Sequence, residues 1–478
     1  MIGLTGIILS LVLLMYLAYR GINVLVLAPL LATVAVLFAG DVPLLATYTQ
    51  VFMAAAGKYI VTYFPLFLLG AIFGKLMDDS GSARTIAHWI VEKTGSERAI
   101  MAVVLACGIL TYGGVSLFVV AFAVFPIASA LFREAGVPKR LIPGAIALGS
   151  FTFTMTALPG TPAIQNAIPM PFFGTDAFAA PGLGLIAGIF MFGFGIAWLT
   201  FRHHRARGAG EGYGRHPRDQ LSEDAGVRQA RSAGAMAVER AEAMPGIVIA
   251  IVPIVLVIAI NYLFTNLAVP RMDTGYLAEP RYGATTVEAV RGTWAIIVAL
   301  ICSSVVLIAL NWRVFSDRLV TSVNEGTMGS LLPIFNTASE VGYGAVIASL
   351  AAFAILRDAV LSLSPDNPLI SLAVAVNVLA GITGSASGGM SIALEALGRT
   401  YLEMGQQAGI DPELLHRVTS ISSGGFDALP HNGAVITLLA ICGLTHRQSY
   451  VDIFMVSVVG PVTALVTVIV LGTVLGSF

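Results

Sequence analysis

Long stretches without Asp, Glu, Lys or Arg constrain this chain more than any other feature. They include 2–19, 21–40, 59–74, 99–132, 141–175, 177–201, 243–270, 292–312, 367–394 and 453–478. A helix that crosses a bilayer needs about 20 apolar residues, and most of these stretches are close to that length. Strands of a membrane barrel would be shorter and would alternate in polarity. The pattern therefore predicts an all-α polytopic membrane protein.

The composition excludes several other classes of protein. Only 11% of the 478 residues are charged and 57% are hydrophobic, whereas an ordinary soluble domain is about 25% charged. A net charge of −1 gives no attraction to nucleic acids. The three cysteines lie in apolar segments at spacings that indicate neither a disulfide framework nor a metal site. We expect no nucleic-acid partner, no metal and no cofactor.

Two uncharged stretches have the wrong length for a simple crossing. Residues 99–132 would form a straight helix of about 51 Å, well above a hydrocarbon core of about 30 Å. They are nevertheless too few for two crossings, and Gly113-Gly114 divides them. Residues 367–394 pose the same problem, with GITGSASGGMS near the middle, and the predicted hairpin extends to 397. Each stretch is predicted to be a re-entrant hairpin, the alternative being one long tilted helix.

Two further stretches are interrupted by proline. FTMTALPGTPAIQNAIP (153–169) and SSGGFDALPHNGAVI (422–436) both contain Ala-Leu-Pro. Proline lacks a backbone donor and clashes with the preceding turn of a helix. Both segments should therefore unwind around Pro159 and Pro430.

These four interruptions form an internal repeat. Gly113 aligns with Gly384 and Pro159 with Pro430 at the same offset of 271 residues. The repeat divides the chain into halves at 1–201 and 246–478, each with five crossings and one hairpin, or about 10 transmembrane helices in total. An odd number of crossings inverts the second half relative to the first. Inverted repeats with interrupted helices are typical of secondary transporters, whose substrate binds between the repeats near the bilayer midplane.

The segment 202–245 joins the halves and is polar and rich in glycine, which predicts a solvated linker. If this linker is cytoplasmic, 19 of the 26 Lys and Arg residues fall on the cytoplasmic side. This distribution follows the positive-inside rule. We therefore expect a multi-pass protein of the bacterial inner membrane, with periplasmic N- and C-termini.

The four interrupted segments also carry a family resemblance. GGVSLFVVAFAVFPIA (113–128), ALPGTPAIQNAIP (157–169), GITGSASGGMSIALEALG (381–398) and SSGGFDALPHNGAVITLL (422–439), in this order, resemble the gluconate permease (GntP) family of the ion transporter superfamily. The resemblance implies proton-coupled import of gluconate, 3-hydroxybutyrate or a related hydroxy acid. It also implies a homodimer in the lipid bilayer that works by an elevator movement.

Polar groups and glycines at the four interruptions are the candidate substrate contacts, because glycine allows a close approach of backbone to ligand. In the first half they are Gly113, Gly114, Ser116, Gly160, Thr161, Gln165 and Asn166. In the second half they are Ser385, Ser387, Gly388, Gly389, Ser391, His431, Asn432 and Gly433. No Lys or Arg lies among them, so helix N-termini, backbone N–H groups and a protonated His431 would bind an anion.

Three titratable residues in apolar stretches are candidates for proton coupling, because such residues inside a membrane are functional by default. Asp427 and His431 are four residues apart and would share a face of a continuous helix. Glu340 is a further candidate proton site. The alternative for Asp427 and His431 is a structural pair joined by a hydrogen bond.

Other functions remain open from the sequence. A Na⁺-coupled carboxylate carrier is possible, because unwound backbone carbonyls beside serines can hold Na⁺. An intramembrane serine hydrolase is a remote alternative, based on Ser387 and His431. The duplicated interruptions favour a transporter over an enzyme, since a hydrolase needs only one such site.

Overall fold

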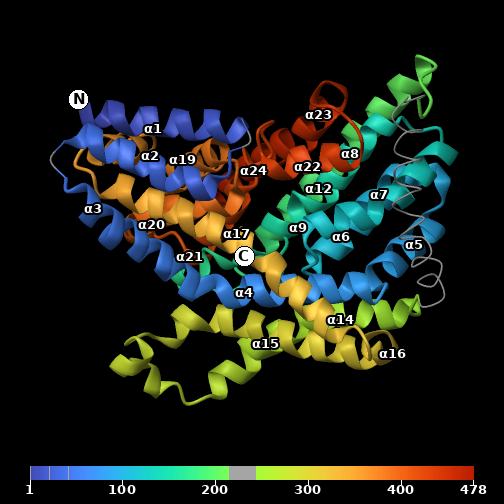
Figure 1. The fold of residues 1–478 in the computed structure, drawn as a ribbon, viewed down its shortest axis with the longest axis horizontal. Coiled ribbons are helices and arrows are strands. Elements are labelled where there is room, and N and C mark those ends of the chain that lie inside the picture. Colours follow the sequence, from blue (N-terminus) through green and yellow to red (C-terminus); the bar gives the residue numbers. More distant parts are fainter. Residues whose placement is uncertain (1, 21, 41, 215–243) are drawn as a thin grey trace.

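The computed structural model describes residues 2–20, 22–40, 42–214 and 244–478. Within these ranges the chain is helical and contains no strand, which confirms the all-α class (Figure 1). The predicted linker lies largely outside the described residues. Its first residues continue α12 (Pro181–Gly208) as helix.

Several helices have the length and composition to cross a membrane. Five of those described pass this test, or up to six when a bent pair counts as one span. The five run over Leu44–Asp79, Pro181–Gly208, Ile247–Arg271, Val287–Leu310 and His446–Leu475. The bent pair is α17 (Leu319–Ser349) with α18 (Phe353–Leu361), at an angle of 95°. A polytopic membrane protein is thus confirmed, whereas the count of about 10 crossings stays a prediction.

The N-terminal helices form one side of the molecule. Helices α1 (Ile2–Tyr19) and α2 (Val24–Ala39) pack together, and α2 also packs on α17. Helix α17 in turn lies along α4 (Met53–Asp79), which follows α3 (Leu44–Ala46) and the π-helix η1 (Thr47–Phe52) (Figure 1). Asn23 caps α2 by accepting a hydrogen bond from the Leu25 amide, which satisfies a free donor at the helix start.

The first predicted hairpin is broken where the two glycines fall. Helix α6 (Ala99–Tyr112) ends directly before Gly113, and α7 (Leu117–Glu134) starts after Ser116. The 14 residues of α6 span about 21 Å, less than the hydrocarbon core. Helices α6 and α7 pack together and contact α5 (Ser82–Thr94).

The second predicted hairpin is broken in the same manner. Helix α19 (Pro368–Thr383) ends at Gly384, whose φ of 64° is left-handed. Helix α20 (Ala386–Gln407) begins two residues later and packs along α19. Glycine is favoured at such a position because it adopts positive φ at no steric cost.

Both Ala-Leu-Pro segments are unwound, as the prolines predict. In the first half, irregular backbone follows α8 (Ile142–Ser150) and α9 (Phe153–Thr156), before the single turns α10 (Ile164–Ala167) and α11 (Met170–Phe173). In the second half, α21 (Pro412–Ser423) and α22 (Gly433–Ile441) flank residues 424–432. We call 157–163 the first break and 424–432 the second break.

The remaining described elements complete the helical framework. They are η2 (Ser96–Arg98), η3 (Lys139–Leu141), α14 (Ile247–Leu263), η4 (Phe264–Ala268), η5 (Val269–Arg271), η6 (Gly275–Ala278), η7 (Pro280–Tyr282), α15 (Val287–Leu310), α16 (Trp312–Phe315), α23 (His446–Phe454), η8 (Met455–Val459) and α24 (Gly460–Leu475).

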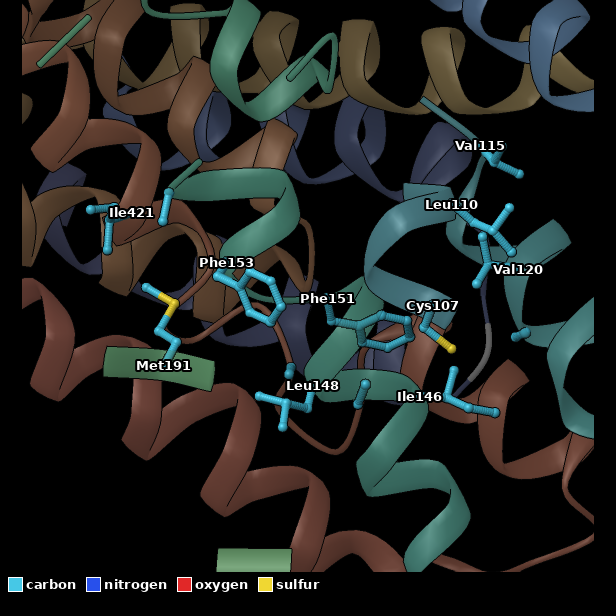
Figure 2. Packing of buried hydrophobic residues seen from close by; sticks show 14 of the residues in the cluster. Cys107, Leu110, Val115, Val120, Ile146, Leu148, Phe151, Phe153, Met191 and Ile421 are labelled. Atoms are coloured by element: carbon cyan, nitrogen blue, oxygen red, sulfur yellow. The ribbon is translucent and has the colours of Figure 1, made fainter. Parts of the chain in front are cut away.

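The main core joins elements of both predicted halves. Figure 2 shows Cys107 of α6, Leu148 of α8 and Met191 of α12 in one apolar cluster with Ile421 of α21. The ring of Phe153, next to the first break, lies in the same cluster. Close packing of this kind holds the first break against α21, so a helix of the second half sets the position of a break in the first.

Candidate substrate and coupling site

Helix termini at the second hairpin and the second break meet around Asn432. Its side-chain amide donates to the Gly384 carbonyl and to Asp427 Oδ1, both at 2.8 Å. Its Oδ1 accepts from the amides of Ala434 and Val435, at 2.6 and 3.1 Å. Asn432 therefore caps α22 and joins two irregular segments, the hairpin tip and the second break, which fixes the position of Asp427.

Asp427 and His431 are not joined in the way their spacing suggests. The structure describes no hydrogen bond between them, because the chain from 424 to 432 is not helical and Asp427 pairs with Asn432 instead. The His431 ring lies against Gly384, where an added Cβ would be 3.1 Å from Cδ2. His431 Nε2 is buried without a hydrogen-bond partner.

Glu340 of α17 reaches the same place from another element. Its side chain is only 3% exposed and lies beside Ser385, within electrostatic range of Asp427. An added Cβ on Gly388 would overlap Glu340 Oε2. Gly388 therefore makes room for the carboxyl group at the start of α20.

The carboxyl groups of Glu340 and Asp427 have no cation partner within ion-pair distance in the described residues. Glu340 Oε2 also lacks any hydrogen-bond partner. Buried polar atoms are nearly always paired, so an unpaired one calls for a proton, an ion, water or a ligand. Asp427 of the second break and Glu340 of α17 thus form a pair of neighbouring acidic groups that lacks a compensating cation among the described residues.

Hydroxyl groups surround this acidic pair. Ser387 Oγ lies 3.3 Å from Thr337 Oγ1 and 3.5 Å from Ser385 Oγ. Ser385 also accepts from the Gly388 amide at 3.0 Å and so caps α20. The oxygens of Ser391 and Tyr59 are buried without a partner. No hydrogen bond joins Ser387 to His431 among the described residues, so the geometry offers no Ser–His dyad.

Tyr59 and Thr337 belong to this group although the sequence did not single them out. Tyr59 lies at the start of an uncharged stretch in α4, and Thr337 lies in α17 one turn before Glu340. The position of Thr337 relative to Glu340 is a usable signal, since residues three apart share a helix face. Nothing in the sequence distinguishes Tyr59 from the other aromatic residues of α4.

The remaining second-half candidates differ in their surroundings. An added Cβ on Gly389 would overlap the backbone of Ala380, so this glycine serves the contact between α19 and α20. Gly433 is exposed and has no atom within 4 Å of an added Cβ.

The first break has the same backbone plan and different chemistry. Gly114 and Gly160 both have positive φ, 93° and 81°. An added Cβ on Gly114 would lie 3.1 Å from Pro162, so the hairpin tip and the break touch. Tyr112, just before the tip, donates to the Pro159 carbonyl at 2.6 Å. No acidic residue lies in either segment.

The other first-half candidates differ in whether they are exposed or buried. Ser116 is exposed, and its side chain does not cap α7. Gly113 is packed on Ile254, which an added Cβ would approach to 2.7 Å. Thr161 is buried and accepts a 3.3 Å hydrogen bond from the Ala163 amide. Gln165 is 7% exposed.

Asn166 is fully engaged within the protein. Its amide donates to the carbonyls of Thr161 and Ala177, at 3.1 and 2.9 Å. Its Oδ1 lies 3.2 Å from both His416 Nε2 and Arg417 Nη1. His416 and Arg417 belong to α21, so Asn166 ties the first break to the second half.

Arg417 corrects the charge count that supported the orientation. The count of 19 cytoplasmic residues leaves seven outside, and Arg417 is one of these seven, yet the residue is 0% exposed. Asp411 accepts from the Glu413 amide and starts α21, which carries Arg417 inward as helix. No Lys or Arg lies among the candidate contacts themselves, but Arg417 lies 3.2 Å from one of them, Asn166.

Comparison with known proteins places the chain among transporters. It is 45% identical over 458 residues to a Bacillus subtilis (strain 168) protein named "Uncharacterized transporter YxjC". The match covers 95% of each chain. No family model matches the chain.

Proposed function

The chain belongs to the same family as the Bacillus subtilis transporter YxjC, and from this premise we propose that it is a proton-coupled symporter for a small organic hydroxy acid. The observation that carries the coupling is the acidic pair at the second break. Two neighbouring carboxyl groups without a cation are costly to bury as anions. A proton that binds there and leaves during the cycle would couple the gradient to transport.

Glu340 and Asp427 form this coupling pair, with His431 as a third titratable group beside them. Glu340 is deeply buried, whereas Asp427 and His431 are partly exposed. A proton could therefore enter through Asp427 and reach Glu340 through Ser385, which adjoins Glu340. Acidic and histidine residues within membrane segments are the usual components of such relays.

The substrate carboxylate is assigned to the helix starts at the two hairpins and breaks. The N-terminus of a helix favours anions. The start of α7 has no side-chain cap, whereas Ser385 and Asn432 each cap part of the starts of α20 and α22. We propose Ser116, Thr161 and Gln165 from the first half and Ser387, Ser391 and Gly433 from the second as contacts. Asn166 and Asn432 would act by holding the breaks in place.

The packing supports two inverted repeats as part of this proposal, which also includes the re-entrant hairpins and membership of the gluconate permease family. Helix α22 of the second half packs on α7 of the first hairpin. Helix α10 of the first half packs on α20 of the second hairpin. This reciprocal packing is what a two-fold relation between the halves would produce. A homodimer in the inner membrane and an elevator movement remain part of the same proposal.

Uptake into proteoliposomes tests the function. Under an inward proton gradient without Na⁺, the purified protein should accumulate labelled gluconate or 3-hydroxybutyrate, and a protonophore should abolish accumulation. A carrier that needs Na⁺ and ignores the protonophore would instead establish the alternative coupling ion. Absence of gradient-dependent uptake for every hydroxy acid tested would contradict the proposal.

A further inference from the structure

One buried cation lies behind the first break and is not used by the proposed function. Arg417 donates through Nε and Nη2 to the Ala179 carbonyl, at 3.0 and 2.6 Å. Its Nη1 lies 3.2 Å from Asn166 Oδ1 and 3.5 Å from the Thr156 carbonyl. All of these acceptors are neutral oxygens.

No carboxylate makes an ion pair with Arg417 among the described residues. Glu413 and Asp176 are acidic residues within electrostatic range of Arg417, and both are engaged elsewhere. Glu413 Oε2 accepts from the Ala180 amide at 2.9 Å. Asp176 accepts from the Phe178 amide and pairs with Arg291 at 3.4 Å. The positive charge of Arg417 is therefore balanced only at a distance, by carboxylates that interact directly with other groups.

Keeping a charge in this position is costly, because a buried ion loses its hydration and needs good partners. A neutral amide side chain could donate hydrogen bonds to the same carbonyls. What arginine adds is a permanent positive charge inside the protein, and charged residues at membrane depth mark functional pathways.

The charge lies directly behind the backbone of the first break. Thr156, whose carbonyl faces Arg417, immediately precedes this break, and Ser420 of α21 donates to the same carbonyl at 2.8 Å. The far side of the break is held by Tyr112, which is within electrostatic range of Arg417 and adjoins the Gly113-Gly114 tip. The guanidinium and the hairpin tip thus flank the same short segment.

We propose that Arg417 supplies the positive charge by which the first break favours an anionic over a neutral solute, acting across residues 156–160 without touching the solute. This inference rests on the proposed function and names a specificity-determining residue for its substrate class. Arg417 is a positioning residue in this sense, and it acts through its charge as well as through its hydrogen bonds.

The test compares acids with their neutral amides on the purified full-length protein. Gluconate and gluconamide, and 3-hydroxybutyrate and its amide, are titrated while the thermal unfolding temperature is measured, which gives a half-saturating concentration for each solute. In Arg417→Gln, the value for the acids should rise about tenfold while that for the amides stays unchanged. Arg417→Lys, which keeps the charge, should retain the preference for the acids.

Glu413→Gln provides a second variant with the opposite expected sign. The glutamine oxygen can still accept from the Ala180 amide, whereas a negative charge near Arg417 is removed. Binding of the acids should therefore strengthen about threefold. This variant decides the question if Arg417→Gln fails to fold.

The outcomes separate this inference from the function on which it rests. If the wild-type protein responds to neither acid, the proposed substrate class is contradicted and the inference falls with it. If the wild type prefers the acids and Arg417→Gln prefers them equally, only the inference is overturned. Equal losses in Arg417→Lys and Arg417→Gln, or no strengthening in Glu413→Gln, would also overturn it.

Discussion

The two breaks share a backbone plan and differ in the charge placed around it. Each follows a helix, passes through Ala-Leu-Pro and lies close to a hairpin tip with a glycine of positive φ. The second break holds Asp427 beside Glu340 and leaves several polar atoms unpaired. The first break has no acid, and Arg417 lies behind it. The same backbone plan can thus carry two kinds of chemistry, which we propose to be proton coupling at the second break and anion selection at the first.

The largest expected effect comes from removing the acidic pair. Glu340→Gln and Asp427→Asn should reduce gradient-driven accumulation to the level of protein-free liposomes, because neither amide can carry a proton in the coupling step. Exchange of labelled for unlabelled substrate at equal pH should persist, since exchange needs no net proton transfer. Normal accumulation in both variants would contradict the proposal that proton coupling belongs to the second half.

A glycine pair in the second half tests the space around Glu340. Gly388→Ala would push a methyl group into the carboxyl group, so we expect a loss of about 1–3 kcal/mol in stability together with impaired accumulation. Gly329→Ala in α17 is the matched control, because no atom lies within 4 Å of the added Cβ. Thermal unfolding in detergent measures both variants, and equal effects would show that Glu340 does not occupy this space.

Two residues at aligned positions, Asn432 and Thr161, compare how much each break depends on its side chains. Asn432→Ala removes a helix cap and two donated hydrogen bonds, which should cost about 2 kcal/mol. Thr161→Ala, at the aligned position of the first half, removes one long hydrogen bond and should cost about 1 kcal/mol or less. Thermal unfolding of both variants would show whether the second break depends more on its side chains. The reverse order would contradict that expectation.

The smallest effect is expected at Glu395, an acid on the same helix as Gly388. Its side chain is 27% exposed and pairs with Lys58 at 3.3 Å. Exposed ion pairs contribute about 0–1 kcal/mol, so Glu395→Gln should leave both accumulation and stability nearly unchanged. This variant is the matched control for Glu340→Gln, and a comparable loss of uptake would remove the distinction between the two acids.

Much of the fold follows from local sequence signals. Gly113-Gly114 and Gly384 mark the ends of α6 and α19 because glycine adopts left-handed backbone at no cost. Pro159 and Pro430 mark the breaks because proline cannot continue a helix. These effects act within a few residues, so the sequence alone is sufficient to place them.

The candidate site depends on contacts that local signals do not contain. Asp427 was paired with His431 on helical spacing, but the unwound chain turns Asp427 toward Asn432 instead. Arg417 was counted on the outer side from the order of the crossings, whereas packing of α21 buries it completely. Tyr59 comes from α4, more than 270 residues before Glu340. Only the tertiary structure brings these groups together.

Measuring proton movement during transport is the direct test of proton coupling through Glu340. A pH-sensitive dye inside proteoliposomes reports whether protons enter when gluconate or 3-hydroxybutyrate is added outside in Na⁺-free buffer. We expect internal acidification with the wild-type protein and none with Glu340→Gln, while substrate exchange continues in both. Substrate uptake by the wild type without acidification, or acidification that persists in Glu340→Gln, would contradict this expectation.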